Sequence, residues 1–299
     1  MGDLFAIASA LCFASANVMI VRGAARGDDD NGAFLSLLLT AAISALGWAA
    51  IGLARGFEPV TGRAIAWFAG AGVFTMFIGR VFLFGSVQRL GAMRGSAMKR
   101  FNPFFAVILG VLVLGETLSG GMAAGMALIV ASFALLVWTS FRRSAGEAIA
   151  GDARRLRAGY ALAVVSGLGY AFGYLFRKMG LADAPDAWLG AAVGSVVGAA
   201  LFVATALFSE RYARAVRATF TRANPWLVGA GTTSSFGQVF YFAALNTLPI
   251  SRVALIVSME VFVTLALGAV FLRKHETLTV AVAVAAALGV AGTACILQG

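Results

Sequence analysis

Long apolar stretches alternate with short polar connections along the whole chain. Each stretch is about as long as a membrane-crossing helix, which needs ~20 apolar residues. Backbone N–H and C=O groups have no water to bond inside lipid, so stretches of this kind must be helical. The pattern therefore predicts an all-α integral membrane protein. We expect ten transmembrane helices, at residues 3–22, 32–54, 63–87, 92–114, 118–141, 157–178, 186–208, 225–246, 251–272 and 277–297.

The second half of the chain repeats features of the first. Residues 79–84 (Gly-Arg-Val-Phe-Leu-Phe) align with residues 237–242 (Gly-Gln-Val-Phe-Tyr-Phe), and residues 116–118 and 276–278 both read Glu-Thr-Leu. Each half holds five predicted helices, and because five is odd, the second half must enter the membrane from the opposite side. Inverted repeats are an architecture of transporters, whose substrate sites lie near the membrane midplane. We expect a first five-helix repeat at 1–141, a charged linker loop at 142–156 and a second five-helix repeat at 157–299.

The composition of the chain excludes several classes of function. Hydrophobic residues make up 61% of the chain and charged residues only 12%, against roughly 25% charged residues in a soluble domain. A soluble enzyme, a nucleic-acid-binding domain and a disordered tail are therefore excluded. The net charge of +10 fits loops at an anionic membrane surface better than it fits a nucleic-acid partner.

Residues suited to catalysis or metal binding are sparse in this chain. Cys12 and Cys295 lie far apart in apolar segments, so we expect neither a disulfide nor a metal site. The single histidine, His275, lies in a short charged loop, and the common hydrolase and nucleotide-binding motifs are absent. We therefore expect no enzyme activity, no catalytic residue and no cofactor.

Polar side chains inside the predicted helices are the candidates for function, because each is costly in lipid unless it is paired or faces water. The alignment of the two halves matches Arg80 with Gln238 and Asn102 with Glu260. Four polar residues at repeat-related positions are the pattern that a central cavity would show. Two structural alternatives stay open: a buried ion pair between Arg80 and Glu260, and extension of the Lys99 and Arg100 side chains to the nearer membrane interface.

Two stretches at equivalent places in the halves resemble a known family. Residues 102–118 run from Asn-Pro-Phe-Phe to Leu-Gly-Glu-Thr-Leu, and residues 248–278 follow the same scheme from Leu-Pro through Ser-Met-Glu to Glu-Thr-Leu. In these features the chain resembles the drug/metabolite transporter superfamily, specifically the ten-helix EamA-type exporters. It departs from their pattern at Val261, where a proline is expected, and at residues 273–275, which interrupt Leu-Gly-Glu.

The resemblance implies both a fold and a function. It implies a central cavity between helices one to four and six to nine, with helices five and ten at the periphery. It also implies export of amino acids and related metabolites by alternating access. Exporters of aromatic amino acids are the most similar, followed by exporters of threonine and homoserine. Flexible points for such a movement are expected at Gly79, Gly95, Pro103 and Gly237.

The polar residues in the helices can be given roles in binding a free amino acid. Such a site needs a cationic or amide donor for the carboxylate, an acceptor for the ammonium, and an apolar or aromatic wall. Arg80, or Lys99 in its place, is the expected donor. Glu260 is the expected acceptor, with Asn102 and Gln238 as alternatives. The full set of expected substrate-binding residues is Arg80, Lys99, Asn102, Gln238, Tyr241, Glu260, Asn17, Tyr174 and Phe82.

Other functions stay open at this point. A passive channel, a lipid-handling membrane scaffold, and a multidrug or organic-cation exporter would share much of this pattern. We expect a small-molecule substrate and contact with membrane lipid, no nucleic-acid partner, function as a monomer, and location in the inner membrane of a bacterium. Energy coupling is also open, with Glu260 as the candidate for a titrating group within a helix.

Two arguments disagree about orientation in the membrane. Fifteen Lys and Arg residues lie near the connections that follow odd-numbered helices, and five lie near the other connections, namely Arg55, Arg63, Arg177, Lys178 and Arg252. By the positive-inside rule, this distribution places the odd connections in the cytoplasm and both termini outside. The family resemblance implies termini inside. We favour the charge count.

Overall fold

The structure, a computed structural model, describes residues 1–24, 32–57, 59–79, 82, 86, 102–145, 153–221, 224–271 and 280–298. These residues form helices joined by turns, and they contain no strand. The prediction of an all-helical chain is therefore confirmed. The elements are α1 (Gly2–Ala24), α2 (Ala33–Arg55), α3 (Gly62–Gly72), the π-helix η1 (Val73–Gly79), α6 (Asn102–Leu114), α7 (Gly120–Ala145), α8 (Ala153–Asp183), α9 (Ala187–Ala206), α10 (Glu210–Thr221), α11 (Pro225–Thr247), α12 (Ile250–Val257), α13 (Glu260–Phe271) and α14 (Val280–Gln298).

Several of these helices can cross a membrane. Within the described residues, six stretches are long and apolar enough: Gly2–Ile20, Ala33–Arg55, Gly62–Gly79, Arg157–Asp183, Ala187–Ala206 and Ile250–Gly268. Shorter apolar helices lie at Asn102–Leu114, Gly120–Leu136 and Ala283–Gln298. α11 has the length of a membrane span, but its run of hydroxyl residues at 232–235 makes it more polar. The chain is thus a multi-pass membrane protein, as its hydrophobic pattern predicts.

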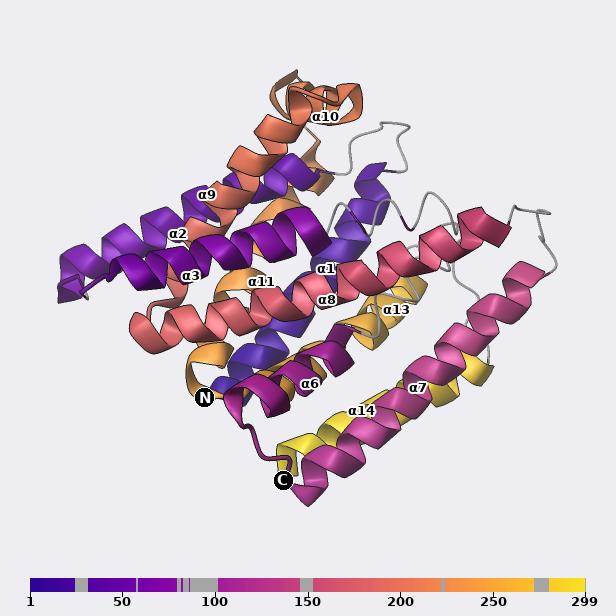
Figure 1. The fold of residues 1–299 in the computed structure, drawn as a ribbon. Coiled ribbons are helices and arrows are strands. Elements are labelled where there is room, and N and C mark those ends of the chain that lie inside the picture. The colour runs from indigo at the N-terminus through magenta and orange to yellow at the C-terminus, as the bar shows by residue number, and fades with distance from the viewer. Residues whose placement is uncertain are drawn as a thin grey trace. The chain divides into compact units, whose positions relative to one another are not determined.

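The helices form two compact units, and each unit draws helices from both halves of the sequence. Unit 1 comprises Met1–Val73, Phe176–Leu248 and Glu260–Glu276. Unit 2 comprises Phe74–Leu175, Pro249–Met259 and Thr277–Gly299. In unit 1, α1 packs on α11 and α13, and α9 packs on α2 and α3 (Figure 1). In unit 2, α7 and α14 lie side by side, and α12 packs on α6.

Glycines let some of these helices approach until their backbones touch. A Cβ added to Gly72 of α3 would lie 2.5 Å from the carbonyl oxygen of Gly194 on α9. In unit 2, a Cβ on Gly125 of α7 would likewise collide with the carbonyl oxygen of Gly292 on α14. Such contacts exclude any larger residue, and they are a main source of helix association in lipid, where helices gain little from the hydrophobic effect.

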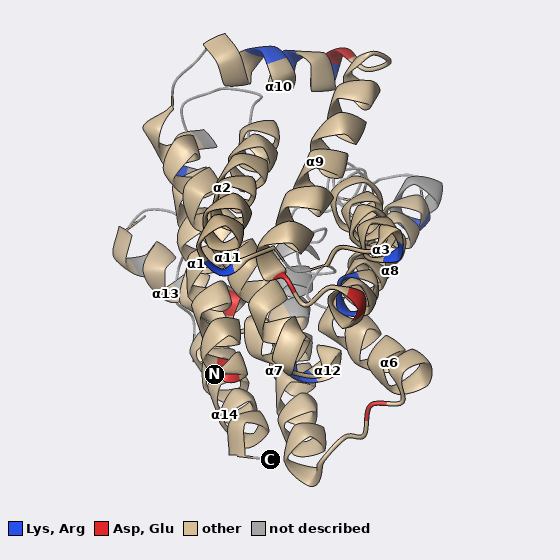
Figure 2. Ribbon diagram, turned by 90° about the vertical axis from the view of Figure 1, so that its left-hand side faces the viewer, with Lys and Arg blue, Asp and Glu red and all other residues tan. Residues whose placement is uncertain are grey.

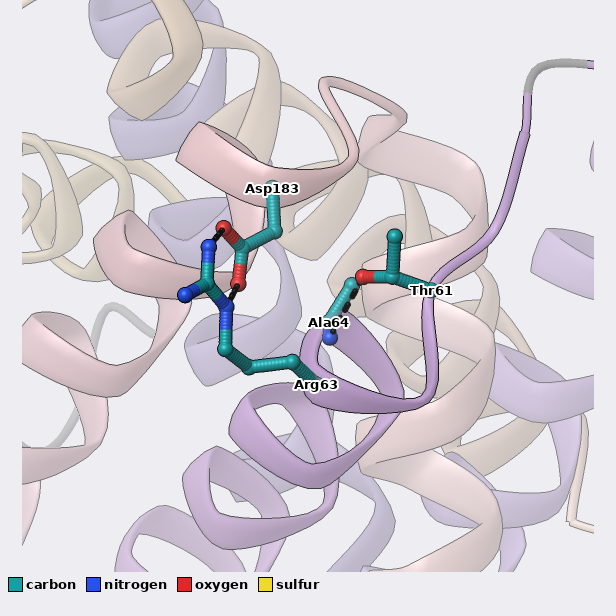
Figure 3. A network of polar contacts seen from close by, with 4 residues as sticks. All are labelled: Thr61, Arg63, Ala64 and Asp183. Atoms are coloured by element: carbon teal, nitrogen blue, oxygen red, sulfur yellow. Dashed lines mark hydrogen bonds and ion pairs between the residues drawn. The ribbon is translucent and has the colours of Figure 1, made fainter.

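A side chain caps the start of α3, and an ion pair joins this helix start to the end of α8 in unit 1. The hydroxyl of Thr61 accepts a hydrogen bond from the backbone N–H of Ala64 at 3.1 Å and so caps α3. Close by, Nε of Arg63 donates to Asp183 at 2.7 Å, and a second guanidinium nitrogen contacts the other carboxylate oxygen (Figure 3). This forked geometry fits a guanidinium to a carboxylate and gives the pair more directionality than a single contact.

In unit 2, a glutamate from the first half of the chain caps a helix of the second half. The carboxylate of Glu116 accepts hydrogen bonds from the backbone N–H of Ile250 and of Ser251, the second at 3.0 Å, and from the Ser251 hydroxyl. These donors belong to the first turn of α12, whose N–H groups have no partner within the helix. Gly115 has a φ of +66°, a conformation that favours glycine, and it turns the chain so that Glu116 can reach α12.

The helix that contains Glu260 is interrupted just before this residue. α12 ends at Val257 and α13 begins at Glu260, with a turn at Ser258 and Met259 between them. The hydroxyl of Ser258 donates to the carbonyl oxygen of Leu255 at 2.6 Å, and the N–H of Met259 bonds three residues back. A serine that bonds its own preceding turn competes with the regular helix pattern. The interruption therefore arises here without the proline expected at position 261.

Candidate functional site

A buried arginine on α8 is the centre of the candidate site. Arg177 is only 4% exposed, and its Nη1 donates a hydrogen bond to Oε1 of Gln238 on α11 at 2.9 Å. Its guanidinium carbon lies 4.7 Å from the ring centre of Phe242 and 5.4 Å from that of Tyr241. The last turns of α8 and the whole of α11 belong to unit 1, so a single compact unit holds this cluster.

The sequence of α11 places the three partners of Arg177 on one face. Gln238, Tyr241 and Phe242 are spaced three and four residues apart, and this spacing brings side chains to the same side of a helix. Phe242 also packs edge-to-face on Phe68 of α3, with the ring centres 5.9 Å apart. Tyr241 and Phe242 are both 2% exposed, so the aromatic wall beside the arginine is part of the core of unit 1.

Lys178, the residue after Arg177, fixes the position of α8 along α11. Nζ of Lys178 donates to the carbonyl oxygens of Leu245 at 2.6 Å and Leu248 at 2.9 Å, at the end of α11. Carbonyls at a helix C-terminus lack partners within the helix and carry partial negative charge, so a cation is stabilised there. Because Arg177 is the preceding residue, this contact helps to keep its guanidinium beside Gln238.

The Arg177 cluster is suited to an anion that has an apolar group beside its charge. A guanidinium presents five N–H donors in a planar fork that matches a carboxylate. Each hydrogen bond to a charged group is worth about 1.5–3 kcal/mol in a desolvated site. The neighbouring ring faces stabilise the cation by a further ~0.5–2 kcal/mol, and they make the surroundings of the guanidinium apolar.

The sequence predicts a helix at 157–178, with Arg177 at its end and near a connection, but α8 continues to Asp183. The sequence signal for this later helix end lies in the residues just after α8. Pro185 cannot continue a helix, and Asp186 caps α9 by accepting a hydrogen bond from the backbone N–H of Trp188. A boundary set at these residues puts both Arg177 and Lys178 well inside the helix, and the count of cations near the connections becomes fifteen against three.

Two of the predicted site residues form a polar pair in unit 2. Asn102, the first residue of α6, is 6% exposed, and its Nδ2 donates to the hydroxyl of Tyr174 on α8 at 3.2 Å. Its Oδ1 is buried and accepts no hydrogen bond from any residue in the described ranges. A buried acceptor without a donor costs about 1–3 kcal/mol. This oxygen can therefore accept an N–H group from a bound molecule.

Two further predicted residues, Asn17 and Glu260, belong to unit 1. Nδ2 of Asn17 on α1 donates to Oγ1 of Thr264 on α13 at 3.4 Å. Glu260 lies one turn before Thr264, and it is half-buried at the start of α13. A carboxylate in the first turn of a helix is stabilised by the helix dipole. Asn17, Thr264 and Glu260 therefore form a polar strip where α1 packs on α13.

One serine-to-glycine contact occurs at equivalent places in the two halves. The hydroxyl of Ser9 on α1 donates to the carbonyl oxygen of Gly237 at 2.8 Å, and that of Ser166 on α8 donates to the carbonyl oxygen of Gly79 at 2.5 Å. A Cβ on either glycine would lie 3.0 Å from an aromatic ring of the same partner helix. Both glycines are thus sites of close helix contact, and their role as flexible points stays a prediction.

The rest of the predicted site is described only in part. Arg80, Lys99 and Gly95 lie outside the described residues. Phe82 is helical and half-buried. Pro103 is the second residue of α6 as described, a position where the missing backbone N–H removes no bond within the helix.

Comparison with known proteins identifies the family. The model of the EamA-like transporter family matches residues 1–138 and 157–298, which make up most of the chain. A solved crystal structure is similar over 98% of this chain and 95% of its own, with a TM-score of 0.66 and 18% identity, and this likeness concerns the fold alone. Among curated proteins, none matches the chain. The chain therefore belongs to the EamA-like transporter family, membrane transporters of the drug/metabolite superfamily.

Proposed function

We propose that this protein exports neutral amino acids, including aromatic ones, and related small metabolites across the inner membrane of a bacterium. The observation that carries the proposal is the guanidinium of Arg177, which is buried in unit 1 beside an amide and two aromatic rings. The family membership supplies the transport function. The chemistry of this cluster supplies the class of substrate.

The carboxylate of an amino acid is the group that Arg177 suits best. An ionisable residue within a membrane span is costly, and in transporters it marks the substrate pathway by default. Gln238 is neutral, so it orients the guanidinium while leaving its net charge unchanged. An incoming carboxylate can accept two parallel N–H···O hydrogen bonds from the guanidinium fork. In this proposal Arg177 takes the role that the sequence had given to Arg80 or Lys99.

The described residues also include candidate partners for the side chain and the ammonium group of the substrate. Tyr241 and Phe242 offer the aromatic surface for an apolar or aromatic side chain. Glu260, half-buried in the same unit, is the proposed acceptor for the ammonium. The sequence also predicts Asn102 as an acceptor; its buried oxygen belongs to unit 2 and has the same acceptor chemistry without the charge.

The proposed mechanism is alternating access by ten helices in two inverted five-helix repeats. Two observations support the repeat. The hydrogen bond of Ser9 to Gly237 has its counterpart in that of Ser166 to Gly79. The family model also matches the chain in two segments, 1–138 and 157–298. Movement of the repeats about a fixed site would then expose it to each side of the membrane in turn.

Counterflow in proteoliposomes tests the proposed function. Proteoliposomes that contain the purified chain are loaded with an unlabelled neutral amino acid, and uptake of the same labelled amino acid is followed against three competitors. These are the free amino acid, its methyl ester, which lacks the carboxylate charge, and its deaminated analogue, which lacks the ammonium. We expect saturable counterflow, strong competition by the free amino acid, weaker competition by the deaminated acid and none by the ester.

Each other outcome has a defined meaning. Competition by esters and organic cations but not by acids would refute the amino acid substrate and favour an organic-cation exporter. Solute flux without saturation or competition would refute the carrier mechanism and favour a channel or a scaffold. An Arg55→Gln variant is the matched control, because Arg55 is an exposed cation at the end of α2, outside the proposed site.

A further inference from the structure

A short helix away from the candidate site carries three exposed arginines. α10 connects α9 to α11, and Arg211, Arg214 and Arg217 occur at every third position along it. This spacing lines them along one side of a helix. All three are exposed, whereas the residues between them are half-buried. α10 is therefore amphipathic, with a cationic side turned away from unit 1.

Aromatic contacts fix α10 across the ends of two membrane helices in unit 1. Tyr212 packs edge-to-face on Phe202 of α9 with the ring centres 4.8 Å apart, and Phe220 packs in the same way on Phe34 at the start of α2, 6.4 Å apart. Phe34 and Phe202 also contact each other, at 5.3 Å. Figure 2 shows that α10 runs across the end of α9 rather than along it. The helix thus has the orientation of an interfacial helix.

Exposed apolar side chains flank the arginines. Leu207 is 77% exposed and Phe208 is 90% exposed, directly before α10, and Phe220 near its end is 73% exposed. Such side chains are unfavourable in water. At the boundary between headgroups and acyl chains they would be buried, while the arginines beside them stay at the level of the phosphates.

A second marker of the membrane surface lies at the same end of unit 1. Arg22, in the last turn of α1, stacks on Trp226 in the first turn of α11, with 4.7 Å between the guanidinium carbon and the ring centre. Tryptophan and arginine at helix ends are typical of the headgroup region. Because α10 directly precedes α11, its arginines lie at this same end of the unit.

We propose that α10 is a docking surface for the headgroups of anionic phospholipids. A guanidinium presents a forked set of donors that matches a phosphate, and three of them on one helix side attract a negatively charged surface. Zwitterionic lipids carry no net charge and lack this attraction. The positive-inside count places this end of unit 1 in the cytoplasm, so the lipids concerned are those of the inner leaflet.

Binding of tail-labelled lipids to the purified full chain in detergent tests this proposal. We expect tighter binding of phosphatidylglycerol than of phosphatidylcholine, and a loss of this preference at high salt. Replacing all three residues, as Arg211→Gln, Arg214→Gln and Arg217→Gln, should weaken phosphatidylglycerol binding by about five-fold per arginine and bring it to the level of phosphatidylcholine. The corresponding triple lysine variant keeps the charge and should keep most of the preference.

Two controls test whether the arginines of α10 themselves attract the lipid. Arg55→Gln removes an exposed cation from the other end of unit 1 and should leave the preference unchanged. The glutamine variant must melt near the wild-type temperature without added lipid, and Arg214→Gln alone serves in its place if it does not. Equal binding of the two lipids by the wild type would overturn the proposal. So would an unchanged preference in the glutamine variant, or displacement of the lipid by millimolar inorganic phosphate.

Discussion

Replacement of Arg177 by methionine separates a substrate-binding role from a purely structural one. Methionine has a similar length and no charge, so it fills the space between α8 and α11 but cannot bind a carboxylate. If Arg177 binds the substrate, the Arg177→Met variant should lose transport and keep its fold. If Arg177 is only structural, the variant should keep transport.

The expected loss of transport follows from the contacts at the site. A carboxylate on the guanidinium forms one or two charge-assisted hydrogen bonds, so we take about 3 kcal/mol as their combined worth. This corresponds to roughly 150-fold weaker binding, and we expect an affinity on the order of millimolar for the wild type. Binding by the variant would then lie near ~0.1 M, by the same arithmetic, and counterflow at ordinary substrate concentrations should disappear.

The expected effect of the same substitution on stability is small, because opposing contributions nearly cancel. Loss of the arginine leaves Oε1 of the half-buried Gln238 without its donor, which costs up to about 3 kcal/mol, and removes contacts to two ring faces. It also removes the desolvation of a buried charge, which is worth several kcal/mol. We therefore expect the apparent Tm to stay within a few degrees of the wild type.

Counterflow and thermal denaturation of the purified protein together check this prediction. Arg177→Lys keeps the charge without the planar fork, so its transport should lie between that of the wild type and that of Arg177→Met. Wild-type counterflow by Arg177→Met, at matched amounts of reconstituted protein, would refute the binding role. A large drop in its Tm would instead show that the arginine mainly supports the packing of unit 1.

Three further changes have defined outcomes. Gln238→Ala removes the group that orients Arg177, so counterflow should stop while the protein stays folded and membrane-inserted; unchanged rates would remove Gln238 from the site. Glu116→Ala deletes the cap of α12 and should lower stability by on the order of 2 kcal/mol, seen as a Tm lower by several degrees, whereas Gln at this position should recover part of the loss. A reporter fused to Gly299 that is active only in the cytoplasm should stay inactive, because the charge count places the C-terminus outside.

The sequence predicts the membrane helices well because their signal is composition over a long window. The stretches around α2, α9 and α8 are apolar enough to be unmistakable, and a backbone in lipid has no alternative to the helix. Helix ends are harder to predict, because they depend on single residues. α8 continues to Asp183, beyond the expected end at 178, so Arg177 lies well inside the helix, where it is buried, and not at the helix end.

The candidate site could be predicted in part, through its polarity but not through its contacts. Gln238, Tyr241 and Asn102 stand out as polar groups in apolar helices, and the structure gives each of them a polar or cationic neighbour. Which group faces which depends on the rotation and depth of each helix. A single sequence does not contain this information, so the contact between Gln238 and a residue of α8 could not be foreseen.

The two aligned halves share contacts that hold their helices together, but they differ at candidate site residues. The contact of Ser9 with Gly237 and that of Ser166 with Gly79 use the same residue types, since each only has to hold two helices close together. Within the same aligned run, position 238 carries an amide where position 80 carries a guanidinium, and position 241 carries a phenol where position 83 carries an alkyl group. A free amino acid has a cationic group, an anionic group and a side chain, so no symmetric arrangement can bind all three. Gln238 and Tyr241, which differ from their aligned counterparts, are therefore the site residues to test first for contact with the substrate, and the matched serine–glycine pairs are the ones to test for stability.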